Sequence, residues 1–539
     1  MDDKQRDTNA TKRSRISRRK FLTGVGAGAA ASTLAMRPAE AIAKVLTPRA
    51  AGLATSPDRF GRIFNLPPFA DLNVPSLRSA LMDMGRPGGV LDARDALDQG
   101  PVNLITNPAL SANNPDNSTH TAGTTFVGQF LDHDITFDQT SRLAVPLEPT
   151  AAPNTRTPGF DLDSVYGGEP TGSPALYNPA DTAKFRVESG GLFEDLPRRS
   201  NNVAIIADER NDENLMIAGL HAAFLLFHNR VVDRLRAQGQ SANVFTAARQ
   251  LVRWHYQWII LREFLPQFIG QPMVDDILRN GRRFYRPAAG QQFIPVEFQG
   301  ACYRFGHSMV RPSYRANLAG DPGGNPATGA PAFFGMIFDP AGSGQADPVD
   351  LRGGARARRR FIGWQTFFDF GGAFTADLRT NKLIDTNIST PLFNLPTGAI
   401  AGNETTPVVL PQRNLLRHIT WSIPSGQNIA RALGVNPVLQ AQDFPELQSF
   451  GHGLPSSTPL WYYVLKEAEL LAGGRTLAGV GARIVGEVFI GLLQLDPTSF
   501  LATNPSWRPT LPRRSGGTGD FRMVDLLTFA RVDPTSRGQ

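Results

Sequence analysis

The chain has 539 residues, of which 41% are hydrophobic and 19% are charged, and its formal net charge is +7. The charged fraction is too low for a chain kept disordered by charge, and the length allows a large buried core. The single cysteine, Cys302, excludes an intramolecular disulfide framework. Nine basic and four acidic residues fall within residues 1–41, so only +2 remains for residues 42–539. We therefore expect no nucleic-acid partner.

The N-terminal segment has the layout of an export signal. A basic stretch with paired arginines, Arg18 and Arg19, precedes an apolar run over residues 21–36 and the small-residue sequence Ala39-Glu40-Ala41. The pair followed by Phe-Leu resembles a twin-arginine signal, which implies the twin-arginine translocation machinery as a partner and a periplasmic or secreted location. A disordered basic tail and an uncleaved membrane anchor remain alternatives. The predicted division is an export signal over residues 1–41 and one domain over residues 42–539.

The apolar run is short of the roughly 20 residues that a membrane-spanning helix needs, and we expect no stable membrane span there or later in the chain. Hydrophobic residues recur at helical spacing in four later stretches, whereas clean strand alternation is scarce. These helical stretches are residues 215–235, 244–268, 460–471 and 480–493. Residues 317–349 are rich in Gly and Pro and predict a long loop. We expect a mainly α domain joined by long loops.

Four short segments contain residue types that carry chemistry. If residues 128–137 are helical, Gln129, Asp132 and His133 share a face, and Asp134 points about 100° further round. The other segments are residues 208–213, 303–309 and 414–426. Taken singly, each has a simpler explanation: a buried histidine in the core, an acidic helix start or a surface ion pair.

Together the four segments resemble the signatures of the animal-type haem peroxidases of the peroxidase-cyclooxygenase superfamily. The matching strings are Gly128-Gln129-Phe130-Leu131-Asp132-His133-Asp134, Arg210 to Glu213 followed by His228-Asn229-Arg230, Arg304-Phe305-Gly306-His307, and Asn414 with Arg417 ahead of Pro424. Their order and spacing agree over about 300 residues. The resemblance implies a mainly α fold with haem between a distal and a proximal helix.

The resemblance also assigns roles to individual residues. His307 is implied as the proximal iron ligand, with its Nδ1–H held by the side-chain oxygen of Asn414. On the distal side, His133 is implied as the acid/base for hydrogen peroxide, beside Arg210, which stabilises negative charge. Gln129 would position peroxide or a halide. Arg417 would lie near a haem propionate.

Two carboxylates match those that form ester bonds to haem methyl groups in mammalian members of the family. They are Asp132 and Glu213, so the resemblance allows haem b to be either free or ester-linked. Some members carry a methionine directly after this glutamate, linked to the haem as a sulfonium. This chain has Asn214 there, so we expect no third link.

The resemblance extends to a calcium loop that ends in Val165-Tyr166-Gly167. Its implied ligands are Thr157, Gly159, Asp161 and Asp163, with Asp134 from the distal helix. Carboxylate and carbonyl oxygens are the ligands that calcium prefers. An acidic, solvated turn is the alternative.

The implied activity is oxidation of a small donor (halide, thiocyanate or phenol) by hydrogen peroxide. Fatty-acid dioxygenases of the same superfamily are a second candidate, and a non-catalytic haem-binding or adhesion protein is a third. In the oxygenases a radical tyrosine stands three residues before the proximal histidine; here that residue is Arg304, and Tyr303 is one residue off. The retention of His133, Arg210 and His307 argues against the third candidate.

Overall fold

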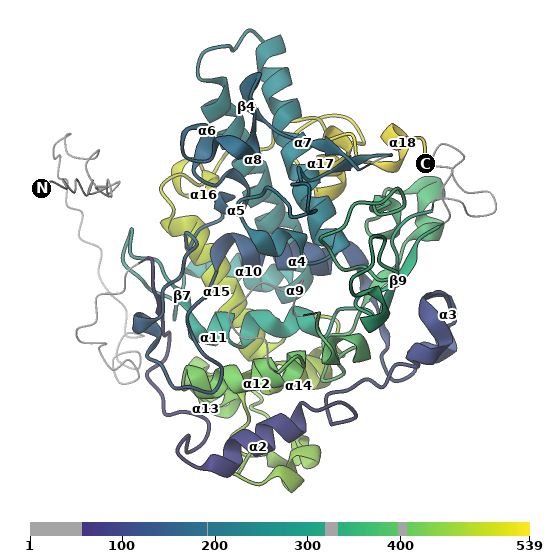
Figure 1. Ribbon diagram of the computed structural model, residues 1–539. Coiled ribbons are helices and arrows are strands. Elements are labelled where there is room, and N and C mark those ends of the chain that lie inside the picture. The colour runs from purple at the N-terminus through teal and green to yellow at the C-terminus, as the bar shows by residue number, and fades with distance from the viewer. Residues whose placement is uncertain (1–56, 191, 319–331, 397–406) are drawn as a thin grey trace, which may run out of the picture. The chain divides into compact units, whose positions relative to one another are not determined.

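The computed structural model describes residues 57–190, 192–318, 332–396 and 407–539. The predicted export signal lies outside these residues. Helices dominate the described part of the chain, as predicted (Figure 1). The α-helices are α2 (Pro75–Met84), α3 (Gly100–Thr106), α4 (Ala122–Ile135), α5 (Asp163–Tyr166), α6 (Glu169–Gly172), α7 (Leu215–Ala237), α8 (Val244–Ile259), α9 (Leu265–Ile269), α10 (Gln271–Asn280), α11 (Val296–Gln299), α12 (Leu410–Thr420), α13 (Gly426–Leu433), α14 (Leu460–Ala472), α15 (Gly479–Leu495), α16 (Phe500–Thr503), α17 (Met523–Phe529) and α18 (Pro534–Arg537).

Strands in the described residues form only two-stranded ladders, which agrees with the scarcity of alternating sequence. One ladder is parallel and four are antiparallel. The pairs are β1 (Phe60–Gly61) with β7 (Ile294–Pro295), β2 (Asp116–Thr121) with β10 (Thr380–Lys382), β3 (Tyr177–Asn178) with β4 (Asp181–Phe185), β5 (Glu188–Ser189) with β6 (Glu194–Asp195), and β8 (Ser313–Arg315) with β9 (Phe334–Met336). The short strand β9 lies within residues 317–349, so it interrupts the long loop predicted there.

All four stretches with helical period are helical. The stretch 244–268 contains one irregularity, a π-helical turn at Ile260–Phe264 between α8 and α9. The Leu265 N–H bonds to the Ile260 carbonyl, five residues back. Pro266 follows and has no N–H to continue the α pattern, which favours the wider turn at this point.

The helix α7 also corrects an expectation about membranes. Its 23 residues are long and apolar enough to cross a bilayer, contrary to the prediction that no later stretch would be. However, 78% of its most apolar window is buried inside the protein. Its composition is therefore that of a core helix, which explains why hydropathy alone is a weak guide here.

The helix α4 lies near the centre of the ribbon in Figure 1, and it packs on α7. The ring of Phe130 stacks on that of Phe224 from α7, with centroids 4.7 Å apart and planes 10° apart. Burial of both rings fixes the face that α4 turns to the core. Its Gln129, Asp132 and His133 face a cavity on the other side.

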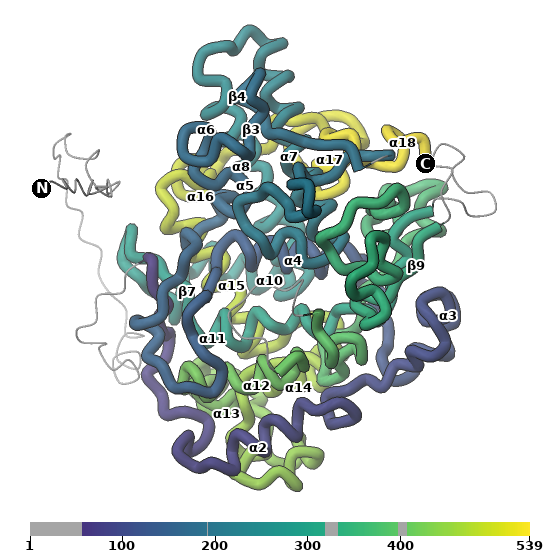
Figure 2. Tube along the Cα trace, in the orientation of Figure 1, coloured from purple at the N-terminus to yellow at the C-terminus, as the bar shows by residue number. Residues whose placement is uncertain are grey.

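His307 lies in a short 3₁₀ turn, Cys302–His307, rather than in the expected proximal α-helix. The preceding α11 is followed by Gly300, where a Cβ atom would lie only 2.7 Å from the Ile423 side chain and from the Val296 carbonyl. The turn is held from α14, since Trp461 Nε1 donates to the Arg304 carbonyl at 3.2 Å. Figure 2 lets the reader follow the chain from α11 through this turn, and α14 packs against the turn.

Candidate active site

One cavity of about 290 Å³ reaches both His133 and His307. We call it the central cavity. Gln129 and Asp132 line it together with His133, as their helical spacing predicts. Asp134 does not line it and bonds on the other side of α4 instead. The face assigned from the sequence is therefore the face that the structure turns to the cavity.

His133 is held by a neighbour that sequence reasoning missed. Its Nδ1 lies 2.9 Å from Oδ1 of Asn211, and both side chains are buried. Burial, with the nearby positive charge of Arg210, lowers the pKa of His133 to about 3. The imidazole is therefore neutral at pH 7 and has one nitrogen able to accept a proton. The available signal for Asn211 was its place directly after Arg210.

Arg210 is fixed by a buried carboxylate and by the backbone of α4. Its Nε and Nη2 donate to the two oxygens of Asp208 at 3.0 and 2.8 Å. Nη2 also donates to the His133 carbonyl at 3.0 Å. The guanidinium lies 4.1 Å from the centre of the Phe137 ring. The cation is thus aimed at the cavity beside His133 without being free to swing away.

Asp208 forms ion pairs with two arginines, Arg156 and Arg210. Arg156 Nε donates to its Oδ2 at 2.8 Å, and Arg210 pairs with the same carboxylate. Burial alone would raise the pKa of Asp208, but the charge and hydrogen bonds of Arg210 hold it well below its ordinary value. Asp208 also accepts the Arg210 N–H at 3.0 Å. The acidic residues therefore begin a 3₁₀ turn, Glu209–Asp212, rather than the suggested start of the long helix α7, and Asp208 also holds Arg210.

The predicted peroxide-positioning residue, Gln129, is clamped from the start of α7. Its Nε2 lies 3.4 Å from Oε2 of Glu213, and its Oε1 accepts from Asn214 Nδ2 at 3.1 Å. Asp132 and Glu213 both line the central cavity. Burial raises the pKa of Asp132, although Arg210 opposes this shift. Both candidate ester residues are therefore on the cavity wall.

On the proximal side the predicted pair is in contact, but through the other amide atom. Nδ2 of Asn414 lies 2.8 Å from Nδ1 of His307. Oδ1 of Asn414 accepts from Arg304 Nη1 at 3.0 Å, so the oxygen expected on His307 is engaged elsewhere. Burial, then the charge of Arg304, lowers the pKa of His307 to about 3.

Three arginines, Arg304, Arg413 and Arg417, line the central cavity on the proximal side. Arg417 bonds to Oδ2 of Asp138 at 3.1 Å and lies 5.1 Å from the Trp421 ring centre. The sequence singled out only Arg417. Arginines at a cavity wall suit the carboxylates of a bound ligand.

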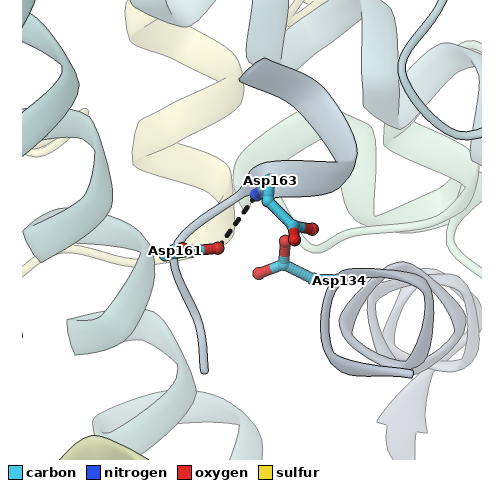
Figure 3. A group of neighbouring side chains, drawn as sticks. All are labelled: Asp134, Asp161 and Asp163. Atoms are coloured by element: carbon cyan, nitrogen blue, oxygen red, sulfur yellow. Dashed lines mark hydrogen bonds between the residues drawn. The ribbon is translucent and has the colours of Figure 1, made fainter. Parts of the chain in front are cut away.

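A second polar cluster lies on the other side of α4. Oxygens of Asp134, Asp161 and Asp163 all lie within 4.8 Å of one another. Figure 3 shows Asp134 reaching from α4 toward Asp163 at the start of α5. The Thr157 N–H donates to Asp163 at 2.9 Å, and the Gly159 carbonyl accepts the Asp161 N–H at 3.0 Å. The structure thus gathers the predicted loop around three carboxylates.

The chemistry of this cluster fits a divalent cation. Burial and the charges of its neighbours raise the pKa of Asp134 well above its ordinary value, and burial with Asp163 raises that of Asp161 to about 7. Oδ1 of Asp163 is buried and accepts no hydrogen bond; Arg156 Nη1 is 3.7 Å away. Crowded carboxylates with an unused oxygen can be stabilised by a bound cation.

The central cavity likewise fits a flat, dianionic cofactor with a metal. It offers an imidazole on each side, three arginines for carboxylates and apolar walls that include Phe264, Phe305 and Phe338. Oε1 of Gln299, on the same wall, is buried and unpaired in the structure. This donor set is typical of a haem pocket.

Part of the chain is similar to a known protein family. Residues 142–328 match the model of the animal haem peroxidase family. Over these residues the chain is similar to this family. The matched residues include Arg210, Glu213 and His307, whereas His133 and Asn414 lie outside them.

Individual relatives are distant. A human protein named "Probable oxidoreductase PXDNL" is 27% identical over 223 residues, which cover 37% of this chain and 15% of the relative. Among solved structures, peroxidase A from Dictyostelium discoideum has a TM-score of 0.57 at 16% identity and covers 87% of this chain and 95% of its own. A fatty acid α-dioxygenase from Arabidopsis thaliana has a TM-score of 0.55 at 15% identity, covering 83% and 73%. At these identities the two structures establish the fold alone.

The substitution Asp208→Asn tests how much the distal side depends on the shared carboxylate. It removes the negative charge that two buried guanidinium groups share, so the free energy of unfolding should fall by about 3 kcal/mol or more. Denaturant unfolding measures this. The matched control is Asp83→Asn, because the Asp83–Arg86 pair is more than half exposed and its loss should cost under about 1 kcal/mol. Equal losses in the two variants would contradict the assigned role of Asp208.

Proposed function

We propose that the protein is a haem peroxidase that oxidises a small donor, a halide, thiocyanate or phenol, with hydrogen peroxide. The observation that carries the proposal is a buried, neutral His133 beside an anchored Arg210, across one cavity from His307. The family match supports haem as the cofactor. The chain spans less than a quarter of the length of the first curated relatives it matches, so their whole activities are not transferred.

The residues present divide the work as follows. Nε2 of His307 would hold the iron, and Arg304, Arg413 and Arg417 would bind the propionates. Bound haem would supply the redox centre at which peroxide is reduced and the donor is oxidised. Nε2 of His133 takes a proton from peroxide and returns it to the outer oxygen, which leaves as water. Arg210 stabilises the negative charge that develops as the O–O bond breaks.

Two details of the proposal concern the haem itself. Asp132 and Glu213 on the cavity wall support ester links to haem methyl groups. The Asn414 amide satisfies Arg304 through its oxygen. For Nδ1 of His307 to donate to this oxygen, Arg304 must release it, and a propionate is a suitable alternative partner for the guanidinium.

Replacing His133 tests the acid/base assignment. His133→Ala should slow the reaction with hydrogen peroxide by about 10²- to 10⁴-fold, since general acid/base catalysis contributes this much, and should leave haem bound. Stopped-flow recording of the Soret band measures the rate. His307→Ala should instead lower the haem content. The matched control is His452→Asn, which suits the left-handed backbone (φ 54°) at that position and should leave the rate unchanged. A parent-like rate in His133→Ala would refute the mechanism.

We infer that Asp134, Asp161 and Asp163 bind calcium, with oxygens of Thr157 and Gly159. The crowding of their carboxylates and the unused Asp163 oxygen support this site.

The sequence of residues 17–41 supports export through the twin-arginine route, which is part of the same proposal.

Calcium at about 100 times its Kd should stabilise the protein by about 2.7 kcal/mol, because a ligand that binds only the folded state adds this much. The readout is the difference in Tm between calcium and chelator. Asp134→Asn should remove most of this difference, whereas Asp98→Asn, on an exposed residue, should keep it. A calcium effect that survives in Asp134→Asn would place the ion elsewhere.

A fatty-acid dioxygenase is a second candidate because Tyr303 lines the central cavity. Its hydroxyl donates to the Gly128 carbonyl at 3.0 Å, which restrains it at the wall. Arg304 occupies the position of the radical tyrosine in such enzymes. We therefore expect no rapid oxygen uptake with linoleate in an oxygen electrode, with equal uptake in the parent and Tyr303→Phe. Rapid uptake that Tyr303→Phe abolishes would favour the dioxygenase.

A further inference from the structure

The side-chain amide of Asn211 lies between two buried imidazoles. Its Oδ1 is 2.9 Å from Nδ1 of His133, and its Nδ2 is 3.0 Å from Nδ1 of His221. The exposed fractions are 0% for Asn211, 1% for His221 and 4% for His133. Water therefore has little access to these contacts, and the three side chains must satisfy one another.

The two ends of an amide are not equivalent. The oxygen only accepts hydrogen bonds, and the NH₂ group only donates them. With Oδ1 on His133, Nδ1 of His133 must carry the hydrogen. With Nδ2 on His221, Nδ1 of His221 must present its lone pair. A neutral imidazole has one N–H, so Nε2 of His133 is left as an acceptor.

The backbone around Asn211 holds this amide in place. Its N–H bonds to the Asp208 carbonyl at 3.0 Å, within the turn that also directs Arg210 at the cavity. Three residues later Asn214 caps α7 by accepting the Ile217 N–H at 3.0 Å. His221 is carried on α7 itself. The oxygen of the Asn211 amide thus contacts a histidine on α4, and its nitrogen contacts a histidine on α7.

We propose that Asn211, oriented by His221, is a positioning residue that fixes His133 in the tautomer whose Nε2 accepts the proton of the peroxide. The role of this tautomer in the reaction rests on the proposed peroxidase function, whereas the tautomer itself follows from the hydrogen bonds. The opposite amide orientation would place a donor on His133, force its hydrogen onto Nε2 and disable the base.

The tautomer can be read directly in the haem-loaded protein. Protein with ¹⁵N-labelled histidine, studied as the diamagnetic ferrous carbon monoxide complex, distinguishes protonated from unprotonated ring nitrogens by NMR. Loss of one signal set in His133→Gln assigns His133. We expect hydrogen on Nδ1 and none on Nε2 in the parent. Hydrogen on Nε2 of the parent would overturn the inference, whether or not any variant folds.

Substitutions test the consequence for the reaction with peroxide. Asn211→Leu keeps the approximate volume but removes the acceptor, and it should slow the reaction at least about 100-fold, the low end of what acid/base catalysis supplies. Asn211→Asp keeps an acceptor for the Nδ1 hydrogen and should stay within about tenfold of the parent, by the same scale. His221→Leu should slow the reaction less than Asn211→Leu, because the amide oxygen can still face His133.

The matched control is Gln427→Leu. Gln427 is also a buried amide, but it bonds to Pro455 and Thr458, and none of these three residues lines the central cavity. Its replacement should lower stability and leave the reaction rate and the His133 tautomer unchanged. A rate for Asn211→Leu within threefold of the parent would refute the inference. Failure of the parent itself to react with peroxide would refute the proposed function, while the NMR result would still decide the tautomer.

Discussion

The distal side of the central cavity depends on one buried negative charge. Asp208 is fully buried and is shared by Arg156 and Arg210, whose side chains are only 13% and 10% exposed. Two desolvated cations on one carboxylate are stable only if the geometry of all three is kept. The turn that begins at Asp208 is therefore fixed relative to α4.

The turn that begins at Asp208 also positions the other polar groups on the distal side of the cavity. From the turn and the start of α7, Arg210, Asn211, Glu213 and Asn214 each reach a group on α4. Arg210 and Asn211 contact the carbonyl and ring of His133, whereas Glu213 and Asn214 contact the amide of Gln129. These contacts hold the turn in a fixed position against α4.

The sequence predicted those parts of the site that follow from helical spacing. Gln129, Asp132 and His133 could be placed on one face, and Asp134 on another, because 100° per residue is a property of every α-helix. Asn211 could not be predicted, since its partner lies 78 residues away and the side-chain contact depends on how the turn docks. The same limit applies to the side-chain amide of Asn414, which both Arg304 and His307 contact.

For the fold, the sequence likewise predicted the long helices but not the short elements that depend on distant contacts. Hydrophobic periodicity was enough for α7, α14 and α15. It could not reveal the 3₁₀ turn at His307, because the contact that holds the turn comes from Trp461, 157 residues after Arg304. The strand β9 exists only because β8 lies beside it, so three residues in a Gly- and Pro-rich stretch gave no local signal.

The adjacency of His133 and Asp134 on α4 constrains how this protein can change over time. One residue faces the cavity and the next faces the acidic cluster that Figure 3 shows, so α4 is a wall shared by two sites. A single inserted or deleted residue upstream within α4 would turn this pair by about 100° and misdirect both side chains at once. Substitutions in the helix can be tried one site at a time, whereas changes in its length cannot.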